Sequence, residues 1–233
     1  MARFIALLRS ILFTPIFYIG SLFFVVAALL ASPFSREMLK RLARSWGQFH
    51  RICCHILLGQ KIRIIGDMPD GPYLYCFKHE SAFETIEQLV LFQRPAVIAK
   101  KELFDIPLWG KVAEMQGMIP VEREAGAKAM RALMTSARAA LAAGRPICLF
   151  PEGTRVPHCT SAPLQAGFAG LYKILNVPVI PVAIDSGRLS PRRNFIKKAG
   201  IITYKVGETI PPGLPREEAE ARVLAAINAL NDE

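Results

Sequence analysis

Short apolar runs alternate with amphipathic stretches from residue 61 to the end of this 233-residue chain. Seven runs have the length and composition of buried strands: 61–65, 73–77, 96–99, 117–121, 147–150, 178–184 and 201–206. Helical periodicity is clearest at 83–93, 125–143, 164–175 and 216–230. Strands that alternate with helices form sheets covered by helices. The sequence therefore predicts an α/β fold with a central, mostly parallel sheet of about seven strands flanked by helices.

The first 58 residues have a different character. Residues 11–31 carry no charge, and a run of 21 residues is just long enough to span a bilayer. Pro15 and Gly20 interrupt this run, so a helix lying in the membrane interface is an equally good interpretation. A basic amphipathic stretch follows at 36–58. We therefore predict N-terminal membrane-anchoring helices over residues 1–58 and an α/β domain over residues 59–233.

The positive charge of the chain is concentrated near its N-terminus. The net charge is +10, and residues 1–60 hold seven Lys or Arg against one acid. A basic, apolar segment suits an anionic phospholipid surface, and no nucleic-acid-binding motif is present, so no nucleic acid partner is expected. If 11–31 spans the membrane, the heavier charge on its C-terminal side puts the main domain on the cytoplasmic face.

Residues 78–84, Lys-His-Glu-Ser-Ala-Phe-Glu, join a predicted strand to a predicted helix. On a helix, positions five apart point about 140° away from each other. His79 and Glu84 can therefore pair only if His79 lies in the turn before the helix, with Ser81 as the N-cap. Ser81 and Glu84 also have the spacing of a capping box, which alone would account for the glutamate. Spacing leaves the catalytic pair and the helix cap equally open.

Cationic residues follow three other predicted strands. Lys100 follows 96–99, Arg123 ends the stretch 117–123, and Arg155 ends Phe-Pro-Glu-Gly-Thr-Arg at 150–155. Ligands of open α/β sheets collect beyond the carboxyl ends of the strands. The three cations are therefore expected to converge near His79 as a receptor for phosphate or another anion. Any one of them alone is better explained as solvated surface charge.

Several reaction classes lack their sequence signals. The chain has no G-x-S-x-G elbow, no P-loop and no G-x-G-x-x-G fingerprint. His50, Cys53, Cys54 and His55 lack the paired spacing of a zinc site, so no metal is expected. Without an obvious nucleophile, His79 is best interpreted as a general base acting on a substrate hydroxyl.

Four stretches, in order, resemble the motifs of the glycerolipid acyltransferase family: KHESAFE, GMIPVER, FPEGTR and VPVIPVAI. The resemblance covers about residues 60–210 and is closest to bacterial 1-acyl-sn-glycerol-3-phosphate (lysophosphatidic acid) acyltransferases. The family's first motif is usually His-x4-Asp, and Glu84 resembles a subgroup with His-x4-Glu. Lys78 stands where many members have Asn.

The resemblance implies that a fatty acyl group passes from acyl-CoA or acyl carrier protein to the free hydroxyl of lysophosphatidic acid, giving phosphatidic acid. The thioester is a co-substrate rather than a cofactor. His79 would take the hydroxyl proton, and Glu84 would hold the imidazole in the correct tautomer. The residues that the resemblance assigns to the acceptor phosphate and its loop are Lys100, Arg123, Glu152, Gly153, Thr154 and Arg155.

Two alternatives remain beside this prediction. The same chemistry could serve another acceptor, such as a lyso-ornithine lipid or a different lysophospholipid. A non-catalytic basic membrane-surface protein is the second alternative, and the intact His79–Glu84 pair argues against it. Five basic residues within 186–198 have no acid among them and would suit anionic headgroups, an acidic carrier protein or solvent alone. They are Arg188, Arg192, Arg193, Lys197 and Lys198.

Overall fold

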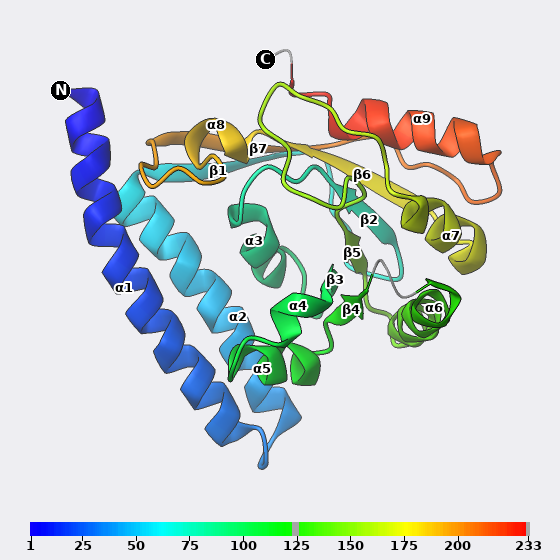
Figure 1. Cartoon of the computed structure of the whole chain (residues 1–233), viewed down its shortest axis with the longest axis horizontal. Coiled ribbons are helices and arrows are strands. Elements are labelled where there is room, and N and C mark those ends of the chain that lie inside the picture. The colour runs from blue at the N-terminus through cyan, green and yellow to red at the C-terminus, as the bar shows by residue number, and fades with distance from the viewer. Residues whose placement is uncertain (123–125, 232–233) are drawn as a thin grey trace.

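The predicted α/β architecture is confirmed by the computed structural model, which describes residues 1–122 and 126–231 (Figure 1). Within these residues, seven strands form one sheet in the order β1-β7-β6-β2-β5-β3-β4. All neighbouring strands are parallel except β6 and β7. The strands are β1 (Gln60–Ile65), β2 (Leu74–Phe77), β3 (Ala96–Lys100), β4 (Ile119–Val121), β5 (Ile147–Leu149), β6 (Val179–Ile184) and β7 (Gly200–Val206).

Helices cover both faces of the sheet. On one face α6 (Gly126–Ala142), α7 (Ala166–Leu175) and α9 (Arg216–Ile227) pack against Leu74 and Cys76 of β2. On the other face Tyr75 and Phe77 of β2 pack with residues of α3 (Phe83–Leu91). All four β2 side chains are fully buried. A strand buried on both faces is apolar throughout, which explains the continuous apolar runs of the sequence.

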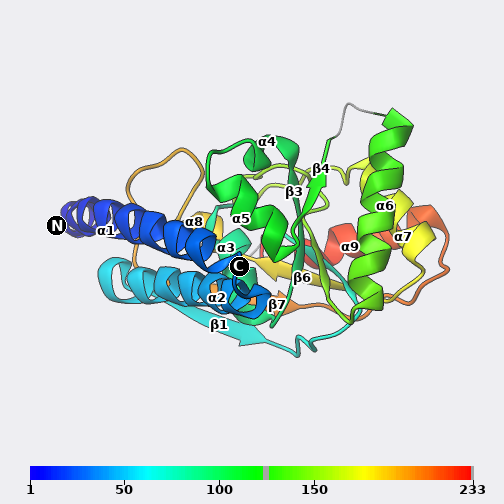
Figure 2. The ribbon, with the colours of Figure 1, turned by 90° about the horizontal axis from the view of Figure 1, so that it is seen from below.

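The N-terminal segment is a helical hairpin that lies along one side of the sheet domain (Figures 1 and 2). Helix α1 (Ala2–Ala31) packs against α2 (Arg36–Cys53), which continues as a π-helical turn, η1 (Cys54–Leu58). Gly20 faces the ring of Phe49, so this glycine allows the two helices to approach closely. Ser21 accepts a hydrogen bond from the indole of Trp46 at 2.9 Å.

Helix α1 is long and apolar enough to cross a membrane. Its most apolar window has a mean hydropathy of 2.2, and only 11% of that window is buried. Phe4, Leu8 and Leu12 are among the large apolar side chains that it leaves exposed. Whether α1 spans the membrane or lies in the interface, and whether the anchor ends at residue 58, stay predictions.

Three short helices were absent from the sequence prediction: α4 (Lys101–Phe104), α5 (Trp109–Gln116) and α8 (Ser186–Leu189). Segments of one or two turns are too short to show a helical period, which explains the omission. The predicted strand 117–121 was two residues too long at its start. Gly117 adopts φ 87° and ends α5 in the left-handed conformation, so β4 begins only at Ile119.

Candidate active site

The predicted contact between His79 and Glu84 is present at the carboxyl end of β2. The chain leaves β2 at Phe77 and enters α3 at Phe83, and the five residues between them form the turn that holds His79. Imidazole Nδ1 lies 2.9 Å from Glu84 Oε1. The ring also stacks on Phe150 with 4.1 Å between centroids. With Nδ1 donating to the carboxylate, Nε2 is the nitrogen left for a substrate.

Glu84 serves the imidazole and the start of the helix at the same time. Its Oε1 also accepts the backbone N–H groups of Glu80 and Ser81, each at 2.7 Å. Its Oε2 accepts the hydroxyls of Ser81 at 2.8 Å and Ser186 at 2.7 Å. Burial raises the pKa of this carboxyl, but the hydrogen bonds and the charge of His79 outweigh burial, and the net pKa is lowered. Glu84 is therefore held as a carboxylate.

The helix starts one residue later than a Ser81 cap requires. Helix α3 begins at Phe83, with Ala82 at the cap position. The Ser81 hydroxyl nevertheless accepts the Phe83 N–H at 3.0 Å, and Glu84 reaches back to the Ser81 N–H, as in a capping box. The two interpretations that spacing left open are thus compatible, because one carboxylate makes both sets of contacts.

Lys78, the residue before His79, forms a buried ion pair with Glu152. The ammonium of Lys78 is fully buried and bonds Glu152 Oε1, the Thr160 carbonyl and Asn228 Oδ1, each at 2.7 Å. The other oxygen of Glu152 accepts the His79 N–H at 3.4 Å. Residues 78–82 are called the catalytic turn, after the role that the resemblance implies for His79. Lys78 therefore ties the catalytic turn to the loop after β5 and to the end of α9. Its charge is neutralised inside the protein.

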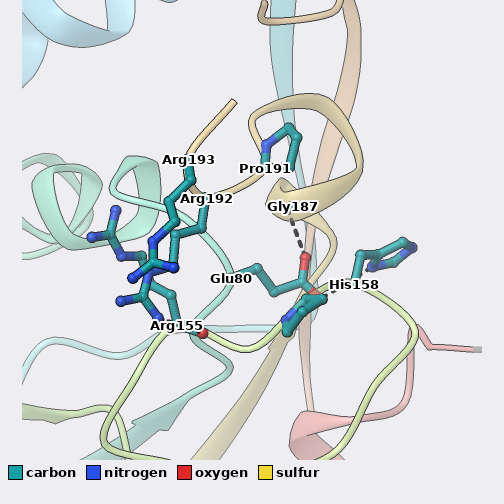
Figure 3. A pocket seen from close by; sticks show the side chains of 8 residues that line it. Glu80, Arg155, His158, Gly187, Pro191, Arg192 and Arg193 are labelled. Atoms are coloured by element: carbon teal, nitrogen blue, oxygen red, sulfur yellow. Dashed lines mark hydrogen bonds and ion pairs between the residues drawn. The ribbon is translucent and has the colours of Figure 1, made fainter. Parts of the chain in front are cut away.

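An arginine cavity of about 300 Å³ opens beside this turn (Figure 3). Its charged lining comes from the catalytic turn and from the loops after β5 and α8, and consists of Glu80, Arg155, His158, Arg192 and Arg193. A guanidinium nitrogen of Arg192 donates to the Thr154 hydroxyl at 3.3 Å. Across the described ranges, no carboxylate makes an ion pair with any of the three guanidiniums. Clustered guanidiniums that make no ion pair suit a bound anion.

The other predicted phosphate residues have varied positions. Arg123 lies outside the described residues. Glu152 is buried against Lys78 and does not line the cavity, so it would shape the loop rather than contact an anion. Gly153 adopts φ 71° in that loop, a conformation that favours glycine. Lys100 is exposed at the start of α4 and also does not line the cavity.

Lys100 therefore does not reach the cavity at the end of β2, where it was expected to join Arg155 near His79. Strand β3 is separated from β2 by β5 in the sheet. Two strand spacings amount to about 10 Å, which displaces the end of β3 from the end of β2. Strand order, which the sequence did not predict, accounts for this difference.

Four residues of the site were missed or given no role from the sequence. Ser186, Glu80 and His158 contribute hydrogen bonds, and Lys78 provides the buried charge. Ser186 follows β6 directly, so the strand-end argument applied to Lys100 would have found it. His158 lies in a loop and carries no sequence signal.

A mostly parallel α/β sheet with a histidine–carboxylate pair and a cationic cavity near its carboxyl edge is typical of the class of α/β enzymes that act on anionic substrates. Comparison with known proteins narrows the class. Residues 61–185 match the family model described as Acyltransferase. This match covers more than half of the chain, so the protein belongs to the acyltransferase family and is an enzyme, as the resemblance of its motifs predicted.

Individual relatives agree with this assignment. A 1-acyl-sn-glycerol-3-phosphate acyltransferase of Pseudomonas aeruginosa is 26% identical over 228 residues, covering 95% of this chain and 86% of that protein. A lyso-ornithine lipid O-acyltransferase of Brucella abortus is 32% identical over 185 residues, covering 72% and 68%. The crystal structure of the 1-acyl-sn-glycerophosphate acyltransferase PlsC of Thermotoga maritima superposes with a TM-score of 0.77 at 20% identity, covering 96% and 95%, and shares the fold.

Proposed function

We propose that this protein transfers a fatty acyl group from an acyl thioester to the free hydroxyl of 1-acyl-sn-glycerol 3-phosphate, giving phosphatidic acid. The observation that carries the proposal is the arginine cavity beside His79 and Glu84. It offers an anion receptor next to a general base. The Pseudomonas aeruginosa relative, which carries this activity in its name, aligns over nearly the whole chain.

The proposed reaction starts at Nε2 of His79. This nitrogen takes the proton of the acceptor hydroxyl as the oxygen attacks the thioester carbonyl. Glu84 keeps Nδ1 protonated and stabilises the imidazolium that forms. The tetrahedral intermediate then collapses, the C–S bond breaks, and the thiolate recovers the proton from the imidazolium. One ester and one thiol result, with no covalent acyl-enzyme intermediate.

The acceptor phosphate is proposed to bind in the arginine cavity. Arginine offers planar, paired N–H donors that match phosphate oxygens. Arg155 is the predicted phosphate residue that lines the cavity, and Arg192 and Arg193 join it from the loop after α8. Lys100 would support the phosphate from outside this cavity, and Arg123, which is not among the described residues, keeps its predicted phosphate role. Holding the phosphate fixes the free hydroxyl near His79, and such positioning is a large part of catalysis in general.

The proposed location is the cytoplasmic face of the inner membrane. Helix α1 presents exposed apolar side chains along its length, and the basic residues that follow 11–31 favour the cytoplasmic side. Both substrates reach such a site readily, because the lysolipid resides in the membrane and acyl-CoA or acyl carrier protein is soluble.

A lyso-ornithine lipid is the second candidate acceptor. The Brucella abortus relative named for that substrate is 32% identical to this chain. The purified protein should be offered lysophosphatidic acid, lyso-ornithine lipid and other lysophospholipids, each with acyl-CoA and with acyl carrier protein. We expect the highest kcat/KM for lysophosphatidic acid. A higher kcat/KM for lyso-ornithine lipid would contradict lysophosphatidic acid as the acceptor and would support lyso-ornithine lipid instead.

Arg155→Ala is expected to raise the KM for lysophosphatidic acid much more than it lowers kcat. A hydrogen bond to a charged group contributes about 1.5–3 kcal/mol, which corresponds to roughly a 10- to 100-fold change in KM. Steady-state kinetics with lysophosphatidic acid and with phosphate-free monoacylglycerol measure the effect. Arg216→Ala, which removes an exposed arginine of α9, is the matched control. Equal impairment with monoacylglycerol would contradict the phosphate role.

A further inference from the structure

Among the described residues that line the arginine cavity, the one acid is Glu80, which the proposed reaction does not use. Its side chain is buried, and Oε2 accepts the backbone N–H of Gly187 at 2.7 Å. Its Oε1 lies 3.1 Å from Nδ1 of His158. Figure 3 shows the carboxylate between His158 and the group of arginines. The cavity therefore combines three guanidiniums with a second histidine–carboxylate pair, whose glutamate follows His79 directly in the sequence.

The backbone fixes the Glu80 carboxylate in this position. A Cβ atom on Gly187 would lie 2.8 Å from Glu80 Oε2, so the close contact depends on glycine. The neighbouring Ser186 holds Glu84, so one short turn after β6 holds both carboxylates. Such precise placement of an acid beside an anion receptor calls for an explanation, since a negative charge there opposes anion binding.

The Glu80 carboxyl, whose negative charge would oppose anion binding, has a pKa near neutral pH. Burial raises the pKa of Glu80 to about 7, although the hydrogen bonds from His158 and Gly187 and the charge of His158 act to lower it. The negative charge of Glu84 adds to the rise. The other charged residues described in the lining of the cavity are Arg155, Arg192 and Arg193. Burial and the charge of Arg155 lower the pKa of nearby Lys197, and His79 is turned toward Glu84.

We propose that Glu80, held in the lining of the arginine cavity by its contacts with Gly187 and His158, takes up a proton when a doubly charged headgroup binds. The affinity of the cavity for a doubly charged headgroup thereby depends on pH. The identity of the headgroup rests on the proposed function, whereas the coupling of anion binding to proton uptake does not.

The direction of the effect follows from electrostatics. A dianion in the cavity lies near the Glu80 carboxylate, and protonating that carboxylate removes the repulsion. Binding and protonation therefore promote each other, and the coupling is reciprocal. Below the range in which Glu80 titrates, its proton is already present and affinity is highest. As the pH rises through neutrality the proton must be acquired on binding, so affinity falls.

Sulfate is the probe that tests this proposal, because it stays a dianion throughout the neutral range. Its binding to the full chain in detergent is measured by titration calorimetry at pH 6.5 and 8.5, and at pH 7.5 in two buffers of different ionisation enthalpy. For the unaltered protein we expect a Kd at least about fivefold weaker at pH 8.5, and net proton uptake at pH 7.5.

Glu80→Gln keeps the shape of the side chain and removes its charge. We expect this variant to bind sulfate with a Kd nearly independent of pH and with little proton uptake. Glu87→Gln is the matched control, because burial also raises the pKa of Glu87 to about 7 but Glu87 pairs with Arg51 and does not line the cavity. It should retain both the pH dependence and the proton uptake.

Three results would overturn the proposal: no sulfate binding, binding of the unaltered protein that is independent of pH, or unchanged proton uptake in Glu80→Gln. The proposed function is judged separately by turnover of lysophosphatidic acid. If turnover is absent but sulfate binding takes up a proton, the proposed proton coupling at Glu80 is supported and the proposed substrate is wrong. If turnover occurs and sulfate binding is independent of pH, only the proposed proton coupling at Glu80 is wrong.

Discussion

His79→Ala is expected to lower kcat for acyl transfer to lysophosphatidic acid by about 10²- to 10⁴-fold, the usual contribution of a general base. The KM for the acceptor should change little, because the proposed phosphate contacts come from the arginine cavity. The expected loss of kcat follows from the position of the imidazole. Nδ1 is held by Glu84 at 2.9 Å, and Nε2 is then the base that would meet the hydroxyl. Steady-state kinetics with a thiol-detecting assay measure both constants.

His55→Ala is the matched control for this variant. His55 is exposed in η1, outside the turn that holds His79, and its replacement should leave kcat unchanged. Circular dichroism and thermal unfolding of both variants would separate a loss of fold from a loss of chemistry. Turnover by His79→Ala equal to that of the unaltered enzyme would contradict the proposed mechanism.

Lys78→Met should lower the free energy of unfolding by about 3–5 kcal/mol, the cost of breaking a buried ion pair from one side. The variant leaves the Glu152 carboxylate buried without its ammonium, and Asn228 and the Thr160 carbonyl each lose a hydrogen bond. For a chain of this size the melting temperature would fall by roughly 6–20 °C. Urea and thermal unfolding of the protein in detergent provide the measurement.

Two further variants identify the cause of this loss. Lys101→Met removes an exposed partner of Asp105 and should cost less than about 1 kcal/mol, as surface ion pairs do. The double variant Lys78→Met, Glu152→Gln removes both buried charges and should be more stable than Lys78→Met alone. If the single variant were as stable as the unaltered protein, Lys78 would not hold the site together.

Much of the fold could be predicted from local sequence patterns. The seven apolar runs became seven strands because a strand buried on both faces must be apolar along its length. The long helices showed their period over several turns, as α6 did with Met134 and Ala137. The His79–Glu84 contact was also accessible, because both residues lie within one turn between a strand and a helix. Family membership followed from four motifs in order.

The rest depended on contacts between segments far apart in the chain. Ser186 reaches Glu84 across 102 positions, and Lys78 reaches Asn228 across 150. The order of the strands determines which loops meet, and it brought the loop after β5 to the catalytic turn while leaving Lys100 outside the cavity. Periodicity reports only which face of its own element a residue occupies. Strand order is set by the packing of whole layers, so the buried Lys78 and the Glu80–His158 pair emerged only from the folded chain.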